Sequence, residues 1–305
     1  MNAHCDWLTQ RLLGNGPPVL IDGGMATELN KAGVPMDEKV WSASAVLTHP
    51  AVIQQCHERY IQAGAEVIIA NTICAGRHVL EPARLGDCVR KINQDAVKLA
   101  IQARDKAADR RVAIAGSVCE WAGPEDPYWH STSGLRSAAH EQIAILVDAG
   151  VDIIALEMCQ IVDKSIVLID EALASGLPVW IGVSARSFDN VTHLSVFDHA
   201  QTDFEILISE IRGYEAAPFN VMHTPVTDVD AALEIVQRHW PGPIGVYPES
   251  GRFGIPHWNF DDVIDPQKLS EYARGWLEKG VRLLGGCCGF GPQHIQALDV
   301  ARQSL

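Results

Sequence analysis

Eight short apolar runs, separated by longer amphipathic stretches, constrain the fold of this chain more than any other feature. The runs are rich in Val, Ile and Ala, and they lie at 18–22, 66–72, 111–117, 152–157, 178–184, 218–223, 244–249 and 281–287. Segments with helical spacing of apolar residues lie between them, at 50–64, 84–108, 138–150, 164–176, 202–214, 228–239 and 266–280. Repeated strand–helix pairs without a hairpin signal predict a parallel sheet that is covered on both faces.

Eight such strand–helix pairs predict a closed (β/α)8 barrel, the TIM-barrel fold. An open doubly wound sheet is the alternative, but it usually has fewer strands and a glycine-rich phosphate turn after the first strand. The turn at 22–25 reads DGGM and does not match that pattern. Because the sequence shows no linker, repeat or low-complexity segment, we expect residues 1–305 to form a single barrel domain.

The composition narrows the kinds of partner that this chain could have. Its 24 basic and 38 acidic side chains give a formal net charge of -14, which disfavours binding to nucleic acid or to anionic membranes. The sequence shows neither a secretion signal nor an apolar run long enough to span a membrane. We therefore expect a cytoplasmic protein with small-molecule substrates, and a homo-oligomer is left open. The 8 cysteines are scattered, so we interpret them as reduced thiols.

The adjacent thiols of Cys287 and Cys288, which lie between glycines, indicate a site for a soft metal ion. Successive side chains on a strand point to opposite faces, so both sulfur atoms can reach one ion only where the backbone leaves regular geometry. Gly285, Gly286 and Gly289 permit that departure. The alternatives are a vicinal disulfide, a redox couple, or two buried thiols that act as small apolar groups.

The residues at the ends of the predicted strands form a candidate constellation, because barrel enzymes build their sites at the C-terminal ends of the strands. Thiolates with imidazole are the ligands expected for zinc, which would hold a substrate thiol as a thiolate. For any single member, capping of the next helix is the simpler interpretation. The residues concerned are Asp22, Asn71, Thr72, Cys74, Ser117, Cys119, Glu157, Cys159, Ser184, His223, Glu249, Cys287 and Cys288.

Two of the loops that follow strands, at 120–130 and 252–258, are rich in aromatic residues. They could cover a site and hold a cationic group against ring faces, although ordinary loop packing is the simpler interpretation.

The chain resembles the homocysteine S-methyltransferase family nearly from end to end. That family includes the betaine- and S-methylmethionine-dependent enzymes and the homocysteine domain of cobalamin-dependent methionine synthase. The segment at 285–295 carries the most specific similarity, and the others are weaker but occur in the right order. The matching segments are IDGGMATEL at 21–29, WSA at 41–43, NT at 71–72, AGSV at 115–118, LE at 156–157, VYPESG at 246–251 and GGCCGFGPQHI at 285–295.

This resemblance implies a (β/α)8 barrel that transfers a methyl group from an onium donor to a zinc-activated homocysteine thiolate, giving methionine. S-methylmethionine, S-adenosylmethionine and betaine are the candidate donors. The resemblance also implies that Glu157 binds the amino group of homocysteine and that Asp22, Gly23 and Gly24 line the amino-acid site, so we expect Asp22 and Glu157 to be catalytic. The remaining expected substrate-binding residues are Asn71, Thr72, Ser117 and Glu249.

The sequence departs from the family at two positions of the expected rim. The family's third zinc cysteine ends the sixth strand, but this chain reads FNVMHTP at 219–225, which places Met222 at the cysteine position. A thioether suits copper(I) better than zinc. We therefore expect Cys287, Cys288 and His223 to bind Zn²⁺, with Cys74, Cys119 or Cys159 as substitutes for the third ligand. Glu249 is the second departure, because S-methylmethionine-dependent relatives tend to carry asparagine there.

Three other functions remain open at this point. The protein could methylate a different thiol, or it could be a non-catalytic amino-acid-binding barrel that lost catalysis together with the third cysteine. The pair Cys287 and Cys288 could also be a redox couple. The sequence itself identifies neither the methyl donor nor a separate cobalamin or folate protein.

Overall fold

The fold is known from a computed structural model, which describes residues 6–14, 16–121, 128, 130–212, 218–254, 257–259 and 262–303. Its centre is a sheet of eight parallel strands in the order β1-β13-β10-β9-β5-β4-β3-β2. All eight predicted strands are present in this sheet. They are β1 (Val19–Leu20), β2 (Val67–Ala70), β3 (Ala113–Cys119), β4 (Ile153–Cys159), β5 (Val179–Val183), β9 (Phe219–Pro225), β10 (Ile244–Glu249) and β13 (Leu283–Leu284).

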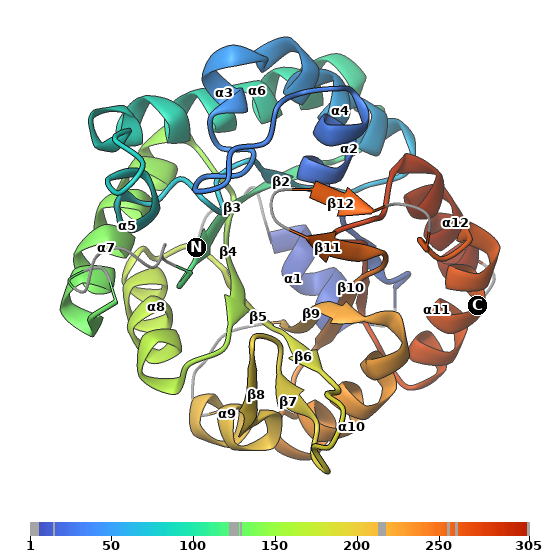
Figure 1. Ribbon diagram of the computed structural model, residues 1–305. Helices are drawn as coiled ribbons and strands as arrows, with labels where there is room; N and C mark the ends of the chain where they lie inside the picture. The colour runs from blue at the N-terminus through green and yellow to red at the C-terminus, as the bar shows by residue number, and fades with distance from the viewer. Residues whose placement is uncertain are drawn as a thin grey trace.

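The sheet closes on itself at β1. This strand pairs with β13, where Val19 lies opposite Leu283, and its end forms a parallel bridge to β2 through Ile21 and Val67. The backbone nitrogen of Asp22 donates a hydrogen bond of 3.1 Å to the carbonyl oxygen of Val67. The view along the barrel shows the strands inside a ring of helices (Figure 1). The predicted (β/α)8 barrel is therefore confirmed.

The helices of the ring cover the outer face of the sheet with their apolar sides. In α6, for example, Ile92, Ala96, Leu99 and Ala103 are buried at the spacing of one helix face. None of the helices in the described part of the chain combines the length and apolar character that crossing a membrane requires. The predicted helical segments correspond to α4 (Pro50–Gln62), α6 (Val89–Ala107), α7 (Thr132–Ala149), α8 (Val162–Ala174), α9 (Phe204–Ile211), α10 (Val229–His239) and α11 (Pro266–Glu278), and α12 (Pro292–Gln303) completes the ring.

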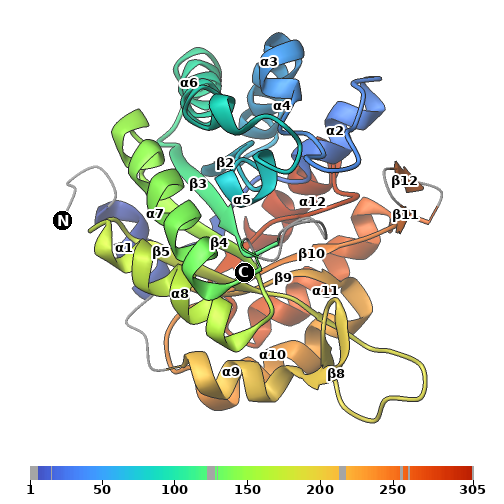
Figure 2. The same cartoon turned by 60° about the vertical axis from the view of Figure 1, so that its left-hand side comes forward.

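A helix that the sequence analysis did not predict, α1 (Asp6–Leu13), closes the N-terminal end of the barrel. Its Leu8 and Leu12 are buried with Ile153 and Trp180, in the same cluster as the side chains that fill the barrel interior. The side view places α1 at one end of the barrel and β8, β11 and β12 toward the other (Figure 2). Access to the barrel interior is therefore blocked at the end where α1 lies.

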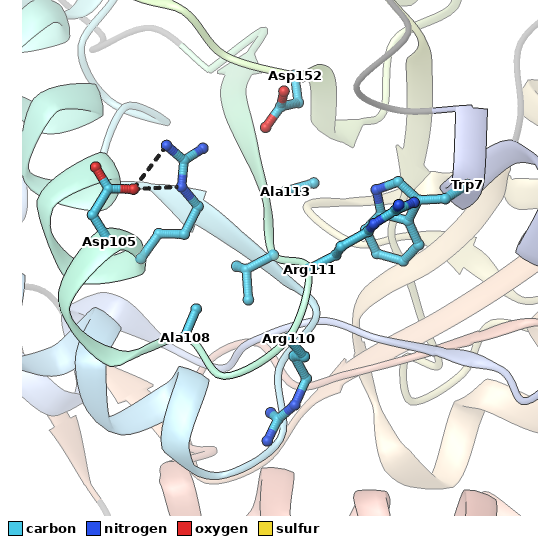
Figure 3. A pocket seen from close by; sticks show the side chains of 9 residues that line it. Trp7, Asp105, Ala108, Arg110, Arg111, Ala113 and Asp152 are labelled. Atoms are coloured by element: carbon cyan, nitrogen blue, oxygen red, sulfur yellow. Dashed lines mark hydrogen bonds and ion pairs between the residues drawn. The ribbon is translucent and has the colours of Figure 1, made fainter.

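A surface hollow of about 460 Å³ lies beside α1, lined by side chains that include Trp7, Asp105, Arg110, Arg111 and Asp152 (Figure 3). Arg110, Arg111 and Asp152 come just before β3 and β4, so the hollow lies at the N-terminal end of the strands. In TIM-barrel enzymes the catalytic groups lie at the opposite end. This hollow is therefore separate from the candidate active site.

Two antiparallel insertions decorate the C-terminal end of the barrel, although the sequence analysis found no hairpin signal. The first, a three-stranded sheet, comprises β6 (Ala185–Arg186), β7 (Ser195–Val196) and β8 (His199–Asp203), and it follows β5. The second is the hairpin of β11 (Arg252–Gly254) and β12 (His257–Asn259), after β10. Short segments α2 (Met25–Lys31), α3 (Ala45–Thr48) and α5 (Arg77–Leu80) follow β1 and β2. All of these additions surround the end where the candidate site lies.

Candidate active site

A cavity of about 100 Å³ opens among the C-terminal ends of the barrel strands. It collects residues from strands that are far apart in the sequence, from Gly23 after β1 to Cys288 after β13. Eight of the predicted site residues line it: Gly23, Gly24, Asn71, Ser117, Glu157, His223, Cys287 and Cys288. The other lining residues are Met25, Ala26, Trp41, Ser42, Ile69, Ala70, Ile73, Met158, Met222, Tyr247 and Gly286.

Two buried carboxyl groups lie on one side of this cavity: that of Glu157 lines it, and that of Asp22 lies behind the lining. Burial raises the pKa of Glu157, although hydrogen bonds from Ser117 and Tyr247 and the positive field of His223 oppose the shift. Asp22 lies behind the lining, where it accepts a hydrogen bond of 2.9 Å from the backbone nitrogen of Ile69. Burial and the nearby Glu157 raise its pKa well above the ordinary range. A cationic ligand would relieve the repulsion between these two groups.

Asn71 and Thr72 shape the neighbouring wall through hydrogen bonds within the protein. Asn71 accepts a hydrogen bond of 2.7 Å from the hydroxyl of Ser42 and donates one of 2.9 Å to its carbonyl oxygen. The hydroxyl of Thr72 exchanges two hydrogen bonds of 2.9 Å with the backbone of Ser117. Thr72 is fully buried and does not line the cavity, so its visible task is to join the end of β2 to β3.

The thiol pair lies in a tight loop after β13. The two sulfur atoms are 3.9 Å apart, and the backbone nitrogen of Cys287 donates a hydrogen bond of 2.8 Å to the carbonyl oxygen of Pro248. Gly289 has a φ of +89°, and a Cβ atom there would lie 1.9 Å from the carbonyl oxygen of Ser250. The backbone thus leaves strand geometry at a glycine, as the sequence analysis expected.

His223 completes a group of three potential metal ligands with Cys287 and Cys288. One ligand atom from each residue lies within 4.8 Å of the others, and the Nδ1 atom of His223 is 3.4 Å from the Sγ atom of Cys287. His223 has a φ of +45°, a conformation that is rare for residues other than glycine. This departure from regular strand geometry occurs at the residue that contributes the imidazole.

Met222, which the sequence analysis placed at the family's cysteine position, has its sulfur atom engaged elsewhere. The thioether accepts a hydrogen bond of 3.3 Å from the backbone nitrogen of Met158 and one of 3.1 Å from the hydroxyl of Ser184. The residue is fully buried in the cluster that fills the barrel. Of the two neighbouring residues, His223 is the one that joins the two thiols.

The chemistry of these three ligands fits zinc, which binds thiolate sulfur and imidazole nitrogen and needs a further position open for catalysis. Without a metal ion, Cys287 and His223 retain their protons at neutral pH. The neighbouring Cys288 and burial raise the pKa of Cys287 well above its ordinary range. Burial opposes a charge on His223, but Cys287, Glu249 and Asp198 outweigh it and raise the pKa of His223 to about 9. A metal ion would have to displace these protons.

Glu249 lies behind His223 and does not line the cavity. One carboxylate oxygen accepts a hydrogen bond of 2.8 Å from the Nη2 atom of Arg186, and the other lies 3.6 Å from the Nε2 atom of His223. The guanidinium of Arg186 is 3.8 Å from the ring centre of Phe197, which is 4.5 Å from the ring centre of His223. Each of these four side chains therefore contacts two of the others, and the contacts form a closed ring.

The alternative third ligands and Ser184 lie outside the cavity lining. The Sγ atom of Cys119 donates a hydrogen bond of 3.0 Å to the carbonyl oxygen of Ile73, and burial raises the pKa of this thiol to about 12. Burial also raises the pKa values of Cys74 and Cys159. Within the described residues, His223, Cys287 and Cys288 are the group of ligands close enough to hold a metal ion.

The sequence analysis missed several residues that shape the cavity. Tyr247, which donates a hydrogen bond to Glu157, was part of a recognised segment but received no role. Trp41 and Met158 line the cavity, and Trp41 packs on Trp121, with 5.6 Å between ring centres. The rest of the aromatic loop at 122–127, with residue 129, lies outside the described residues, as do residues 255 and 256 of the second loop.

Comparison with known proteins places this chain in a family. The model of the family described as homocysteine S-methyltransferase matches residues 19–301. The chain belongs to this family. It is 30% identical to a homocysteine S-methyltransferase of Bacillus subtilis, across 97% of this chain and 98% of that protein. It is 26% identical to a selenocysteine Se-methyltransferase of Brassica oleracea, across 98% of this chain and 93% of that protein.

A solved structure agrees with the fold. The homocysteine methyltransferase of Escherichia coli, in its metallated form, superimposes with a TM-score of 0.77 at 24% sequence identity. The similarity covers 97% of this chain and 99% of that one. This similarity supports the (β/α)8 barrel fold of the chain.

Proposed function

We propose that this protein transfers a methyl group from an onium donor to the sulfur of homocysteine, giving methionine. The observation that carries the proposal is the group of two thiols and one imidazole within 4.8 Å, in a cavity that the buried carboxyl group of Glu157 also lines. A sulfur-binding group and an ammonium-binding group thus face one small space. Membership of the homocysteine S-methyltransferase family supports the same function.

Glu157 and Asp22 would recognise the amino group of the acceptor. Both carboxyl groups have raised pKa values because burial disfavours their charge, so an ammonium group nearby would stabilise their ionised forms. The hydroxyl of Ser117 hydrogen-bonds to Glu157 and fixes its orientation. The acceptor would then be held by its amino end, with its sulfur free to reach the thiol loop.

Cys287, Cys288 and His223 would hold a zinc ion at the other end of the acceptor. When bound, zinc would supply Lewis acidity that lowers the pKa of the substrate thiol, so that the acceptor releases its proton to solvent and is a thiolate at neutral pH. A lone pair of that sulfur then forms a bond to the donor's methyl carbon. The bond from this carbon to the donor's sulfur or nitrogen breaks, and its electron pair leaves with the neutral thioether or amine.

Met25, Trp41 and Met158 give the cavity an apolar and polarisable wall. Such a wall would exclude water and would favour a sulfonium or quaternary ammonium group close to the Trp41 ring. This chemistry suits S-methylmethionine, S-adenosylmethionine and betaine, so each of the three is tested as donor.

The decisive experiment measures zinc content and methionine formation in wild type and in the variants Cys287→Ala, Cys288→Ala and His223→Ala. We expect about one zinc ion per chain in wild type, and loss of both metal and activity in all three variants, because three protein ligands are needed to hold catalytic zinc. Met222→Leu is the matched control, since it changes the neighbouring residue whose sulfur is engaged by Met158 and Ser184. It should keep its zinc.

Two results would contradict the proposal. Wild-type protein without zinc after anaerobic supplementation, and without methyl transfer from any of the three donors, would exclude the catalytic function. Loss of zinc in Met222→Leu but not in His223→Ala would show that Met222, and not His223, is the third ligand.

Methylation of a different acceptor is the second candidate function. The replacement of the family cysteine by Met222 and His223 favours it, because this change lies where the acceptor's reacting atom would bind. One relative of this chain is also named for selenocysteine. A panel of thiols and selenols, compared by kcat/KM, separates the two candidates. Binding of homocysteine without turnover would instead favour a non-catalytic amino-acid-binding barrel.

We also propose that residues 1–305 act as one barrel domain in the cytoplasm, on small molecules and not on nucleic acid or membranes. The free thiols of all seven described cysteines support a reducing compartment. The net charge of -14 supports small molecules as partners, because it disfavours binding to nucleic acid and to anionic membranes.

A further inference from the structure

We infer that Glu249 is a positioning residue that orients the His223 ring toward the two thiols. The inference rests on the proposed function, because it assumes that His223 binds the metal ion. It gives Glu249 a different task from the substrate binding that the sequence suggested. Glu249 is 4% exposed and does not line the cavity, so a substrate in that space would not touch it.

The two nitrogen atoms of His223 face two different groups. The Nδ1 atom points to Cys287 at 3.4 Å, and the Nε2 atom lies 3.6 Å from a carboxylate oxygen of Glu249. The second separation is that of an ion pair and is longer than a direct hydrogen bond. Metal-binding histidines generally direct their other nitrogen to a carboxylate or carbonyl group, which fixes the tautomer and the ring plane. Glu249 lies where such a group is required.

Arg186 and Phe197 hold this arrangement from the opposite side. Arg186 donates to the Glu249 oxygen that does not face His223, so the carboxylate is oriented by a cation at 2.8 Å. Phe197 lies between the guanidinium and the imidazole, at 3.8 Å from the first and 4.5 Å from the second. Glu249 at its edge and Phe197 against its face thereby restrict the rotation of the histidine ring.

The backbone explains why these side chains meet. The register of β10 against β9 shifts after Tyr247, so that Glu249 lies opposite Pro225. The insertion that carries Arg186 and Phe197 is fastened to the barrel, since Ala185 donates a hydrogen bond of 3.0 Å from its backbone to the hydroxyl of Thr224. The insertion therefore supplies both side chains to the histidine next to Thr224.

The test compares the zinc affinity of Glu249→Gln with that of wild type by competition against a chelator, in the full-length protein. Loss of such a supporting carboxylate typically weakens metal binding about 10- to 100-fold, and we expect a loss in that range. Glu205→Gln is a matched control, because Glu205 also pairs with an arginine, Arg238, and a histidine, His239, but on the surface of α9 and α10. Its affinity should equal that of wild type.

A double-mutant cycle with His223→Cys separates positioning from a general structural role, because this variant keeps three zinc ligands but has no imidazole ring to orient. If Glu249 acts through the His223 ring, adding Glu249→Gln to His223→Cys should cause no further loss of affinity. The absorption of the cobalt(II)-substituted protein should also change in Glu249→Gln, because the imidazole is held differently. An unchanged affinity in Glu249→Gln, or an equal loss in both backgrounds, would overturn the inference.

If Glu249→Gln does not fold, Arg186→Met provides the test, because it leaves the carboxylate in place but removes the cation that orients it. We expect a smaller loss of affinity in this variant, of several-fold, and no loss would count against the inference. Failure of the inference is distinguishable from failure of the proposed function. In the first case wild type binds zinc and forms methionine while the variants keep their affinity, whereas in the second case wild type itself does neither.

Discussion

Individual side chains at the strand ends determine what this site can bind. Met222 and His223 are adjacent, and the structure turns the thioether into the barrel while the imidazole joins the thiols. The sequence analysis favoured His223 over Met222 because imidazole suits zinc better than a thioether does. It could not show how the imidazole reaches the two thiols, because that depends on the positive φ of His223 and on the two donors that engage the Met222 sulfur.

At the same scale, the hydrogen bond from Ser117 to Glu157 should set the pH range of acceptor binding. This bond lowers the pKa of Glu157, which burial raises. In Ser117→Ala the pKa of Glu157 should rise further, so that the carboxylate protonates at a higher pH and the acid limb of kcat/KM moves upward. The measurement is kcat/KM for homocysteine from about pH 5 to about pH 8, the range in which a carboxyl group with a raised pKa would titrate.

Ser165→Ala is the control for this prediction. Ser165 on α8 donates a hydrogen bond of 3.1 Å to another buried carboxylate, that of Glu120 after β3. Its removal should leave the acid limb where it is in wild type. An unshifted acid limb in Ser117→Ala would show that Glu157 does not govern acceptor binding.

Among the structural elements, the thiol loop and the strands around it were predictable to different degrees. The strands were found because buried parallel strands are continuous apolar runs, such as that of β4. The insertion of β6 to β8 was missed because its strands are short and partly exposed, as in β8, and so lack a clear apolar pattern. Arg186 and Phe197 belong to this insertion, which is why two of the three side chains that support His223 escaped sequence analysis.

The loop itself should not tolerate a side chain at Gly289. Its φ of +89° strains other residues, and a Cβ atom would collide with the carbonyl oxygen of Ser250. Gly289→Ala should therefore lower the free energy of unfolding by about 1–3 kcal/mol and weaken zinc binding, because the loop cannot keep the two thiols together. Urea unfolding and zinc titration measure both effects.

Gly275→Ala offers a matched glycine on α11. No atom lies within 4 Å of a Cβ placed there, and the residue is helical. This substitution should raise the free energy of unfolding by about 0.5–1 kcal/mol, because alanine has the higher helix propensity. If both glycine variants behaved alike, the collision at Gly289 would not be the cause.

At the level of the whole molecule, a buried histidine outside the site should make the fold sensitive to acid. His57 on α4 is fully buried, and neither ring nitrogen has a hydrogen-bond partner among the described residues. Burial lowers its pKa from 6.5 to about 3. Between these two values the unfolded chain binds a proton that the folded protein does not. The stability is therefore complete above pH 6.5 and falls as the pH drops toward 3.

His57→Gln should remove this part of the pH dependence. Wild type should lose about 1.4 kcal/mol of stability per pH unit below the unfolded pKa from this group alone. The variant will be less stable at neutral pH, because it also buries a polar group, but its stability should fall less steeply toward acid. Urea unfolding of both proteins at several pH values gives the two slopes. Parallel slopes would show that His57 is not responsible.

The closure of the barrel at β1 also decides when the site comes into existence. Gly286 donates a backbone hydrogen bond of 3.0 Å to Asp22, and Gly24 donates one of 3.0 Å to Phe290. These bonds join the loop after β1 to the loop after β13, where the first and last strands of the barrel meet. These loops contribute Gly23, Gly24 and both thiols to the cavity. A chain emerging from the ribosome carries Gly23 and Gly24 early but cannot place them beside the two thiols until β13 has been made. The cavity is therefore complete only after the last strand of the barrel has been synthesised.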